Sequence, residues 1–163
     1  MLPVVDDTSP PILLIVSPPV MDMAWVERQK HELGRVHARN ERFAVISYSG
    51  FVKTMPGARE RRALTEWINT PEQREVQKLL CVASSTQLDS APKRAFLQAL
   101  LWMWDPPYPH VVHATLEESL DWCTARLTEA GIYVPTRLRT RVLTTVRQMH
   151  TAHDEPMRRV DRG

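Results

Sequence analysis

Apolar runs alternate with amphipathic helical patterns along the chain. The clearest run is ILLIVS, residues 12–17, which lies between two proline pairs, and further runs occupy residues 43–49, 79–84 and 110–114. A run without polar alternation is typical of a strand that is buried on both faces, as in a parallel sheet. The pattern therefore predicts four strands.

A helical pattern follows each of the first three strands. Asp22 can cap a helix that reaches about Arg39. The pattern from Gly57 to Leu80 is expected to break before Pro71, because the residue before a proline disfavours the helical conformation. A third helix is expected over about residues 91–104, capped by Asp89 or Ser90.

The two C-terminal helices have the sharpest local signals. Thr115 and Glu118 have the spacing of a capping box, and Gly131 is suited to end the helix that they open. A second pattern begins at Thr136, with an apolar stripe of Leu138, Val142, Val146 and Met149. An isolated helix of this length is marginal in water, so the stripe must cover this domain or another chain. We expect this domain, because the linker at 133–135 is short.

The alternation predicts an α/β fold, with a four-stranded, mostly parallel sheet, helices on both faces and a C-terminal amphipathic helix. Residues 1–11 contain three prolines and no periodicity, and are expected to form a flexible lead-in. The α/β domain is expected over residues 12–132, the C-terminal helix over 133–153 and a frayed tail over 154–163.

Composition and charge narrow the class of protein. The 163 residues include 21 basic and 19 acidic ones, and a net charge of +2 is too small to predict nucleic acid or an anionic membrane as the main partner. Seven arginines follow Pro135, which leaves nucleic-acid binding through this helix as an alternative. The apolar run at 12–16 is too short to span a bilayer, and we expect a cytoplasmic protein.

Some side chains are expected in the core. Two cysteines, Cys81 and Cys123, cannot build a disulfide framework, and Cys81 is expected to be unreactive on a buried strand. Trp67, Leu100 and Trp122 are predicted to be core residues.

The segment from Cys81 to Leu127 resembles the STAS-like group of bacterial proteins, whose fold is that of anti-sigma-factor antagonists and sulphate-transporter regulatory domains. The shared features are an apolar strand, a polar loop, a helix opening near Arg94, a proline-rich turn, a short strand and a capping-box helix that reaches Trp122. The segment from Arg62 to Trp67 is similar to the preceding helix of that group.

The resemblance extends over about residues 12–130 and implies a STAS-like fold and the binding of partner proteins, in some members under the control of phosphorylation. The Asp–Ser acceptor motif of those members does not occur between Ser49 and Thr54. A phosphorylation switch is therefore without support in this sequence.

Candidate contact residues lie where strands end, because ligands of open α/β sheets bind beyond the carboxyl ends of the strands. Possible ligand or partner contacts are Ser49, Lys53, Ser84, Ser85 and Arg94, together with Trp104 and Tyr108 around the proline-rich turn. Either one of Trp102, Trp104 and Tyr108 packs on the prolines, or the three form an exposed patch for a partner.

No residue is assigned a catalytic, cofactor-binding or metal-ligating role. The sequence contains no nucleophile elbow, dinucleotide fingerprint or P-loop. His110 and His113 are three residues apart on a strand and are expected on opposite faces, while His150 and His153 lack further ligands nearby.

The sequence therefore predicts a non-catalytic, cytosolic regulatory or protein-interaction module, with a partner protein and with self-association as a further option. One alternative is a small ligand-binding domain or enzyme that uses the loops at the carboxyl ends of the strands. The other is nucleic-acid binding through the Arg-rich C-terminal helix.

Overall fold

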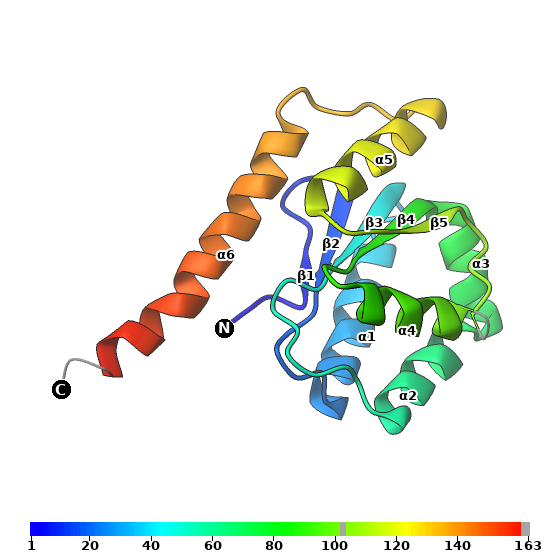
Figure 1. The fold of residues 1–163 in the computed structure, drawn as a ribbon. Helices are drawn as coiled ribbons and strands as arrows, with labels where there is room; N and C mark the ends of the chain where they lie inside the picture. Colours follow the sequence, from blue (N-terminus) through cyan, green and yellow to red (C-terminus); the bar gives the residue numbers. More distant parts are fainter. Residues whose placement is uncertain (102–103, 161–163) are drawn as a thin grey trace.

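The computed structural model describes residues 1–101 and 104–160, with the side chains of 96, 99–101 and 155–160 left out of the description. These residues form five strands and six helices (Figure 1), in the order β1 (Val5–Asp6), β2 (Ile12–Val16), α1 (Met23–His37), β3 (Phe43–Tyr48), α2 (Ala58–Ile68), α3 (Pro71–Leu80), β4 (Cys81–Gln87), α4 (Ala91–Leu101), β5 (His110–His113), α5 (Leu116–Glu129) and α6 (Leu138–Val160).

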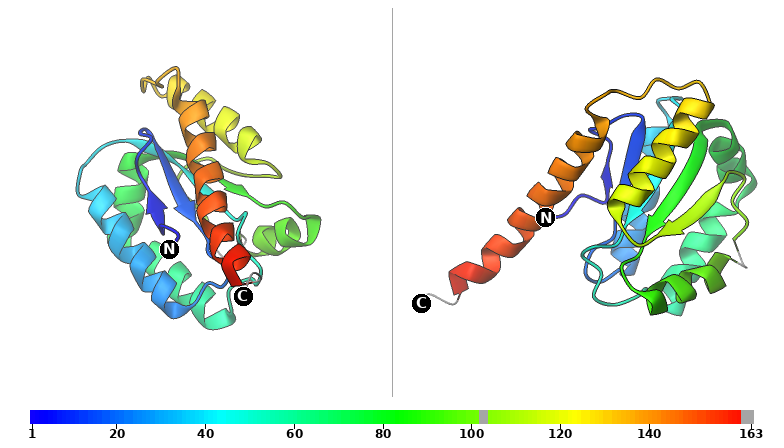
Figure 2. Two further views of the ribbon diagram at one scale, coloured as in Figure 1. Left: turned by 90° about the vertical axis from the view of Figure 1, so that its left-hand side faces the viewer. Right: turned by 45° about the horizontal axis from the view of Figure 1, so that its top comes forward.

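The strands lie in the sheet in their order along the chain, β1-β2-β3-β4-β5. The pairs from β2 to β5 are parallel, and β1 runs antiparallel to β2. Because each right-handed crossover moves one strand further in the same direction, α1 to α4 follow one face of the sheet. Helices α5 and α6 cover the other face (Figures 1 and 2). The prediction of an α/β fold with helices on both faces is confirmed.

The N-terminal segment corrects the predicted count of four strands. Val5 pairs with Ile15 and Asp6 with Leu14, so this segment adds a fifth, antiparallel edge strand. Val4 and Val5 are buried, which a flexible lead-in would not be. A two-residue strand has no periodicity to detect, and pairing with β2 and apolar burial stabilise it instead.

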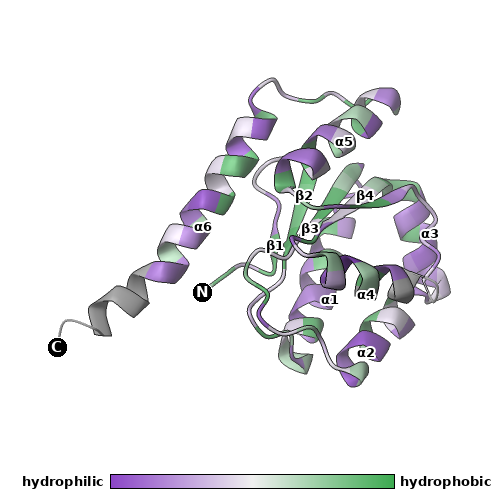
Figure 3. Cartoon of the chain, in the orientation of Figure 1, coloured by the Kyte–Doolittle hydropathy of each residue, from purple (hydrophilic) through white to green (hydrophobic). Residues whose placement is uncertain are grey.

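Alternate residues of the strands enter two separate cores, because neighbouring side chains point to opposite faces. Leu13, Ile15 and Val45 pack against α1 in the first core. Leu14 and Ile46 pack against α5 and α6 in the second. Both faces of β2 and β3 are therefore apolar (Figure 3). None of the helices in the described part of the chain combines the length and apolarity needed to cross a bilayer.

The expected helix signals act at the helix ends. The Asp22 carboxylate accepts from the backbone N–H of Trp25 at 2.8 Å and caps α1. Thr115 and Glu118 form the predicted capping box at the start of α5. The break between α2 and α3 falls before Pro71, as predicted. Gly131 follows α5 with a φ of +75°, a conformation that glycine adopts at little cost.

Helix α6 packs on its own domain. Leu138, Val142 and Val146 are buried in the second core, and Met149 is partly buried beside them. The stripe could have covered this domain or another chain. In the structure it covers the face of the sheet that α5 also covers. The apolar stripe that predicted an amphipathic helix is therefore buried by residues of the same chain.

The predicted core residues need one correction. Trp67 and Trp122 are partly buried rather than core residues, and the Leu100 side chain and Trp102 lie outside the described residues. Trp122 lies at the edge of α5, where its ring is 6.2 Å from that of His113 and the Arg126 guanidinium is 5.8 Å from its centre. Trp67 packs against the edge of the first core and borders a cavity.

Candidate ligand-binding site

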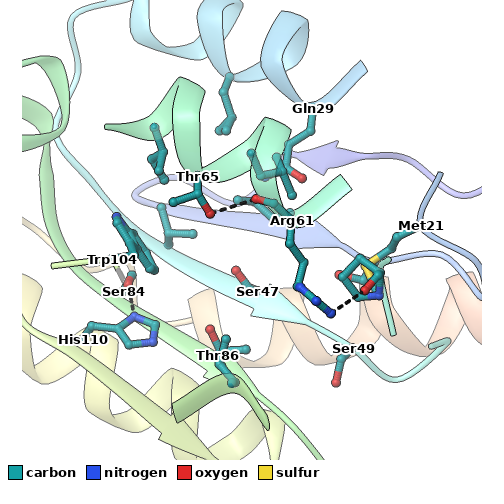
Figure 4. A pocket seen from close by; sticks show the side chains of 18 of the residues that line it. Met21, Gln29, Ser47, Ser49, Arg61, Thr65, Ser84, Thr86, Trp104 and His110 are labelled. Atoms are coloured by element: carbon teal, nitrogen blue, oxygen red, sulfur yellow. Dashed lines mark hydrogen bonds between the residues drawn. The ribbon is translucent and has the colours of Figure 1, made fainter. Parts of the chain in front are cut away.

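A cavity of about 270 Å³ lies between the sheet and the helices on its first face (Figure 4). Its floor is the first-core face of β2, β3 and β4. Apolar side chains line the floor near the amino ends of the strands, and hydroxyl groups line it near their carboxyl ends, namely those of Ser17, Ser47, Ser49, Ser84 and Thr86. Side chains of α1, α2, α3 and α4 line the cavity opposite this floor and leave it partly open.

Aromatic rings form much of the cavity wall. They come from segments far apart in the sequence and belong to Trp25, Phe43, Trp67, Trp104 and Tyr108. The ring of Trp104 meets that of Tyr108 edge-on at 6.5 Å. Such walls offer a large apolar surface with a few fixed polar atoms, which is the usual character of a small-molecule site.

Five buried polar atoms on the lining residues have no hydrogen-bond partner among the described residues. They are the indole nitrogens of Trp25 and Trp104, the side-chain oxygens of Gln29 and Gln77, and Nε2 of His110. Trp25 and Gln77 are only 4% and 6% exposed. Buried polar groups are nearly always paired in proteins, because an unpaired one costs about 1–3 kcal/mol. A cluster of five around one cavity therefore points to a role for this space.

His110 forms a polar corner of the cavity with Ser84. Its Nδ1 lies 2.5 Å from the Ser84 hydroxyl, and its ring meets that of Trp104 edge-on at 5.5 Å. Burial lowers the pKa of His110 to about 4, so the imidazole is neutral at physiological pH. The Tyr108 phenol lies against Ser84 and Cys81, and burial raises the pKa of both the phenol and the Cys81 thiol.

Arg61 extends from α2 over the floor of the cavity toward Ser49 and Met21 (Figure 4). Its Nη1 donates to the carbonyl oxygen of Pro56 at 3.1 Å, which holds the guanidinium at this end. The Thr65 hydroxyl donates to the Arg61 carbonyl at 2.8 Å, one turn along the same helix. No Asp or Glu occurs among the described lining residues, so Arg61 is the source of charge in this wall.

The cavity brings together four of the seven predicted contact residues, Ser49, Ser84, Trp104 and Tyr108. Trp104 and Tyr108 are half-buried and line this cavity, so they do not form the exposed patch that was one of the two options. Ser49 also ties two strand ends together, since its hydroxyl donates to the Gln87 carbonyl at 2.5 Å.

The other three predicted contact residues lie elsewhere. Lys53 is exposed. Arg94 donates to the Leu88 carbonyl at 3.0 Å, a contact that closes the loop before α4. Ser85 is fully buried on the opposite face of the sheet, where its hydroxyl lies 2.9 Å from Nδ1 of His113 and donates to Ser119 at 2.8 Å. His110 and His113 thus point to opposite faces, as the strand spacing predicted.

Several lining residues were not predicted from the sequence. Gln29 lies four residues from both Trp25 and Leu33, so it interrupts the apolar stripe of α1. Gln77 adjoins the apolar positions of α3 in the same way, and Arg61 shares the inward side of α2 with Leu64. A polar residue on a stripe that must be buried is the signal that could have identified them.

The histidines of α6 take part in packing. The ring of His150 stacks on Phe51 at 4.2 Å, and its Nε2 lies 2.7 Å from the Tyr48 hydroxyl. The described residues contain no group of three or more His, Cys, Asp or Glu side chains arranged to hold a metal ion.

Neither a protein-family model, nor a curated protein, nor a solved structure matches this chain. The cavity is therefore the feature of this chain that points to a function.

Proposed function

We propose that this protein is a non-catalytic ligand-binding module that holds a small, mainly apolar organic molecule between its sheet and helices α1, α2 and α4. The observation that carries the proposal is the set of five unpaired buried polar atoms around an apolar, aromatic-walled cavity. A ligand with an apolar body fits the aromatic walls, and its few polar atoms would pair with these groups once their side chains turn toward the space.

The size of the cavity supports this class of ligand. A cavity of roughly 150 Å³ lined by apolar side chains is enough to bind benzene. The space here, about 270 Å³, accommodates two fused rings with a small polar substituent. A peptide or a dinucleotide would extend beyond it.

The chemistry of the wall supports binding rather than catalysis. Ser84 and His110 are paired, but no carboxylate among the described residues bonds to His110 Nε2 to orient the ring. With its pKa lowered to about 4, this imidazole is a weak base, and it takes a proton from a serine hydroxyl poorly. The same pair serves well as a fixed hydrogen-bonding group.

A regulatory role in protein interaction is the second candidate, and it comes from the STAS-like resemblance. The α/β fold with helices on both faces supports it at the level of fold class. In this form of the proposal, the module is cytosolic and bacterial, and ligand binding changes the affinity for a partner protein or for a second copy. Nucleic-acid binding through the arginines of α6 is the remaining alternative.

A cavity-filling variant tests the proposal. The probe is 2-naphthamide, an uncharged two-ring molecule with one carbonyl and one amino group. Saturating probe should raise the melting temperature of the parent protein, because a ligand that binds only the folded state stabilises it. Thr86→Leu puts a larger apolar side chain into the cavity floor and should abolish this rise without lowering the melting temperature of the free protein.

The matched control is Thr144→Leu, the same change at an exposed position of α6. It should respond to the probe as the parent does. A melting temperature that does not respond to the probe in the parent, or an equal response in Thr86→Leu, would contradict the proposal.

A further inference from the structure

We infer that the ligand of this cavity is an aromatic carbonyl compound, a ketone or an amide, whose carbonyl oxygen is bound by the hydroxyl groups of Ser47 and Thr86. The inference rests on the proposed function and names the polar group that the same site selects.

Ser47 and Thr86 lie side by side on the cavity floor. They are in register on the neighbouring strands β3 and β4, and both line the cavity (Figure 4). Neighbouring strands lie about 4.8 Å apart, so the backbone holds the two side chains at nearly this spacing. The rigid part of the fold therefore positions both hydroxyl groups.

Both side chains are accessible from the cavity. Strands β3 and β4 are central in the sheet, and helices pack on both of its faces. Ile46 and Ser85, the adjacent residues that point to the second face, are 0% exposed. Ser47 and Thr86 are partly exposed although helices cover their face as well. Their accessible surface therefore opens into the cavity.

Neither hydroxyl has a hydrogen-bond partner among the described residues. Two other hydroxyl groups of the floor are already paired, since that of Ser49 donates to the Gln87 carbonyl and that of Ser84 lies 2.5 Å from Nδ1 of His110. A ligand that covers the floor removes the two unpaired hydroxyls from water. This removal costs free energy unless the ligand supplies a partner.

Two hydroxyl donors at this spacing suit one carbonyl oxygen. A carbonyl oxygen has two lone pairs and accepts two hydrogen bonds. An O–H···O bond is about 2.8 Å long, so one oxygen can lie within reach of two donors that are about 4.8 Å apart. An N–H group of a ligand would use the lone pairs of the hydroxyls and leave their protons without an acceptor. The pair therefore selects an acceptor.

The floor also sets the direction of the rings. Val45 and Phe43 continue the cavity floor along β3 toward its amino end. The four residue steps from Ser47 to Phe43 span about 13 Å, which is long enough for two fused rings. The rings therefore lie over Val45, and the carbonyl points toward the carboxyl end of the strands, the side at which open α/β sheets bind their ligands.

Two ligands of the same shape test the inference. They are 2-acetylnaphthalene and 2-isopropenylnaphthalene, in which a CH₂ group replaces the carbonyl oxygen. Their dissociation constants are measured by equilibrium dialysis at pH 7.5 with the full chain. The two ligands differ in their hydration, so the deciding quantity is how a variant changes the ratio of the two constants.

Thr86→Val and Ser47→Ala each remove one hydroxyl, and valine keeps the shape of threonine. In each variant the affinity for the ketone should fall about fivefold, because one neutral hydrogen bond is lost. The affinity for the alkene should change by less than about twofold, which shows that the cavity still forms. The control Thr144→Val makes the same change at an exposed position of α6 and should alter neither constant.

The infrared spectrum of the ketone gives a second readout. With ¹³C at the carbonyl, the C=O stretching band should move to lower wavenumber when the ketone binds the parent protein, because hydrogen bonds weaken the bond. In Thr86→Val the band should return part of the way. A band that does not move on binding, or that moves equally in the variant, would contradict the contact.

The outcomes separate the two proposals. A ratio that neither Thr86→Val nor Ser47→Ala changes, including an equal loss of both ligands, overturns the inference. Binding of both ligands to the parent then leaves the ligand-binding function standing. Absence of binding for both ligands in the parent overturns the inference together with the proposed function.

Discussion

His110 shows how burial sets the behaviour of a single residue. Its ring is held between Ser84 and Trp104 on the cavity wall, and desolvation lowers its pKa from 6.5 to about 4. The folded protein therefore binds a proton at this site less readily than the unfolded chain does. The difference links protein stability to pH.

The pH dependence of stability should reveal this histidine. Well above pH 6.5 the site is neutral in both states and its contribution is complete. As the pH falls from 6.5 to about 4, the unfolded chain takes up a proton that the folded chain does not. The free energy of unfolding therefore falls by up to about 3 kcal/mol. In His110→Asn, urea unfolding should show a shallower loss across this range, and the exposed-site control His31→Asn should keep the full slope. Equal slopes in His110→Asn and the parent would contradict the burial of the ring.

The two cysteines should not react with thiol reagents in the folded state. Both are buried, and burial raises the pKa of Cys123 to about 12. Since the thiolate is the reactive form, an aromatic disulfide reagent at pH 8 should label neither residue at an appreciable rate in the native protein. Both should react in denaturing urea. Rapid native labelling of either thiol would place it at the surface.

At the scale of elements, helix α5 buries one stripe and exposes the other. Leu120 is 0% exposed in the second core, whereas Trp122 is partly buried at the helix edge. Leu120→Ala should cost about 2–5 kcal/mol of unfolding free energy because it leaves a void. Trp122→Ala should cost less, although its side chain is larger, because solvent already reaches the ring. Chemical denaturation of the two variants measures both values, and the reverse order would show that the face of α5 is misassigned.

Helix α6 should be required for the stability of its own domain. Ending the chain after Ile132 removes Leu138, Val142 and Val146 from the second core. The melting temperature should fall, and a dye that binds apolar surfaces should gain fluorescence. A chain that ends after His153 keeps these contacts and serves as the control. An unchanged melting temperature in the shorter chain would show that the helix contributes nothing to the fold.

Most elements could be predicted because their signals are local. A carboxylate at Asp22, a proline at Pro71 and the Thr115–Glu118 pair each act on the backbone within one turn. Strand β1 could not be predicted, because two residues are too few to show an alternating pattern. Its position depends on antiparallel pairing with β2, which a local sequence pattern does not contain. The degree of burial of Trp122 depends in the same way on tertiary contacts that no local pattern contains.

At the scale of the molecule, the order of the strands creates the cavity. Four parallel strands in chain order place α1 to α4 on one face, and side chains of these helices line the cavity over that face. The sequence could identify residues at strand ends, and Ser49 and Ser84 do line the space. It could not reveal the space itself, because a cavity is a property of how Trp25, Arg61 and other distant residues pack together.

A map of where a probe binds tests most directly whether this cavity is a ligand-binding site. Heteronuclear NMR spectra of the ¹⁵N-labelled full chain are recorded while 2-naphthamide is added. We predict that the largest shifts cluster on the first face of the sheet, at Ser47, Thr86 and the indole N–H signals of Trp25 and Trp104, with little change in α5 and α6. Shifts confined to α5, α6 or scattered surface residues would contradict the claim that this cavity is a ligand-binding site.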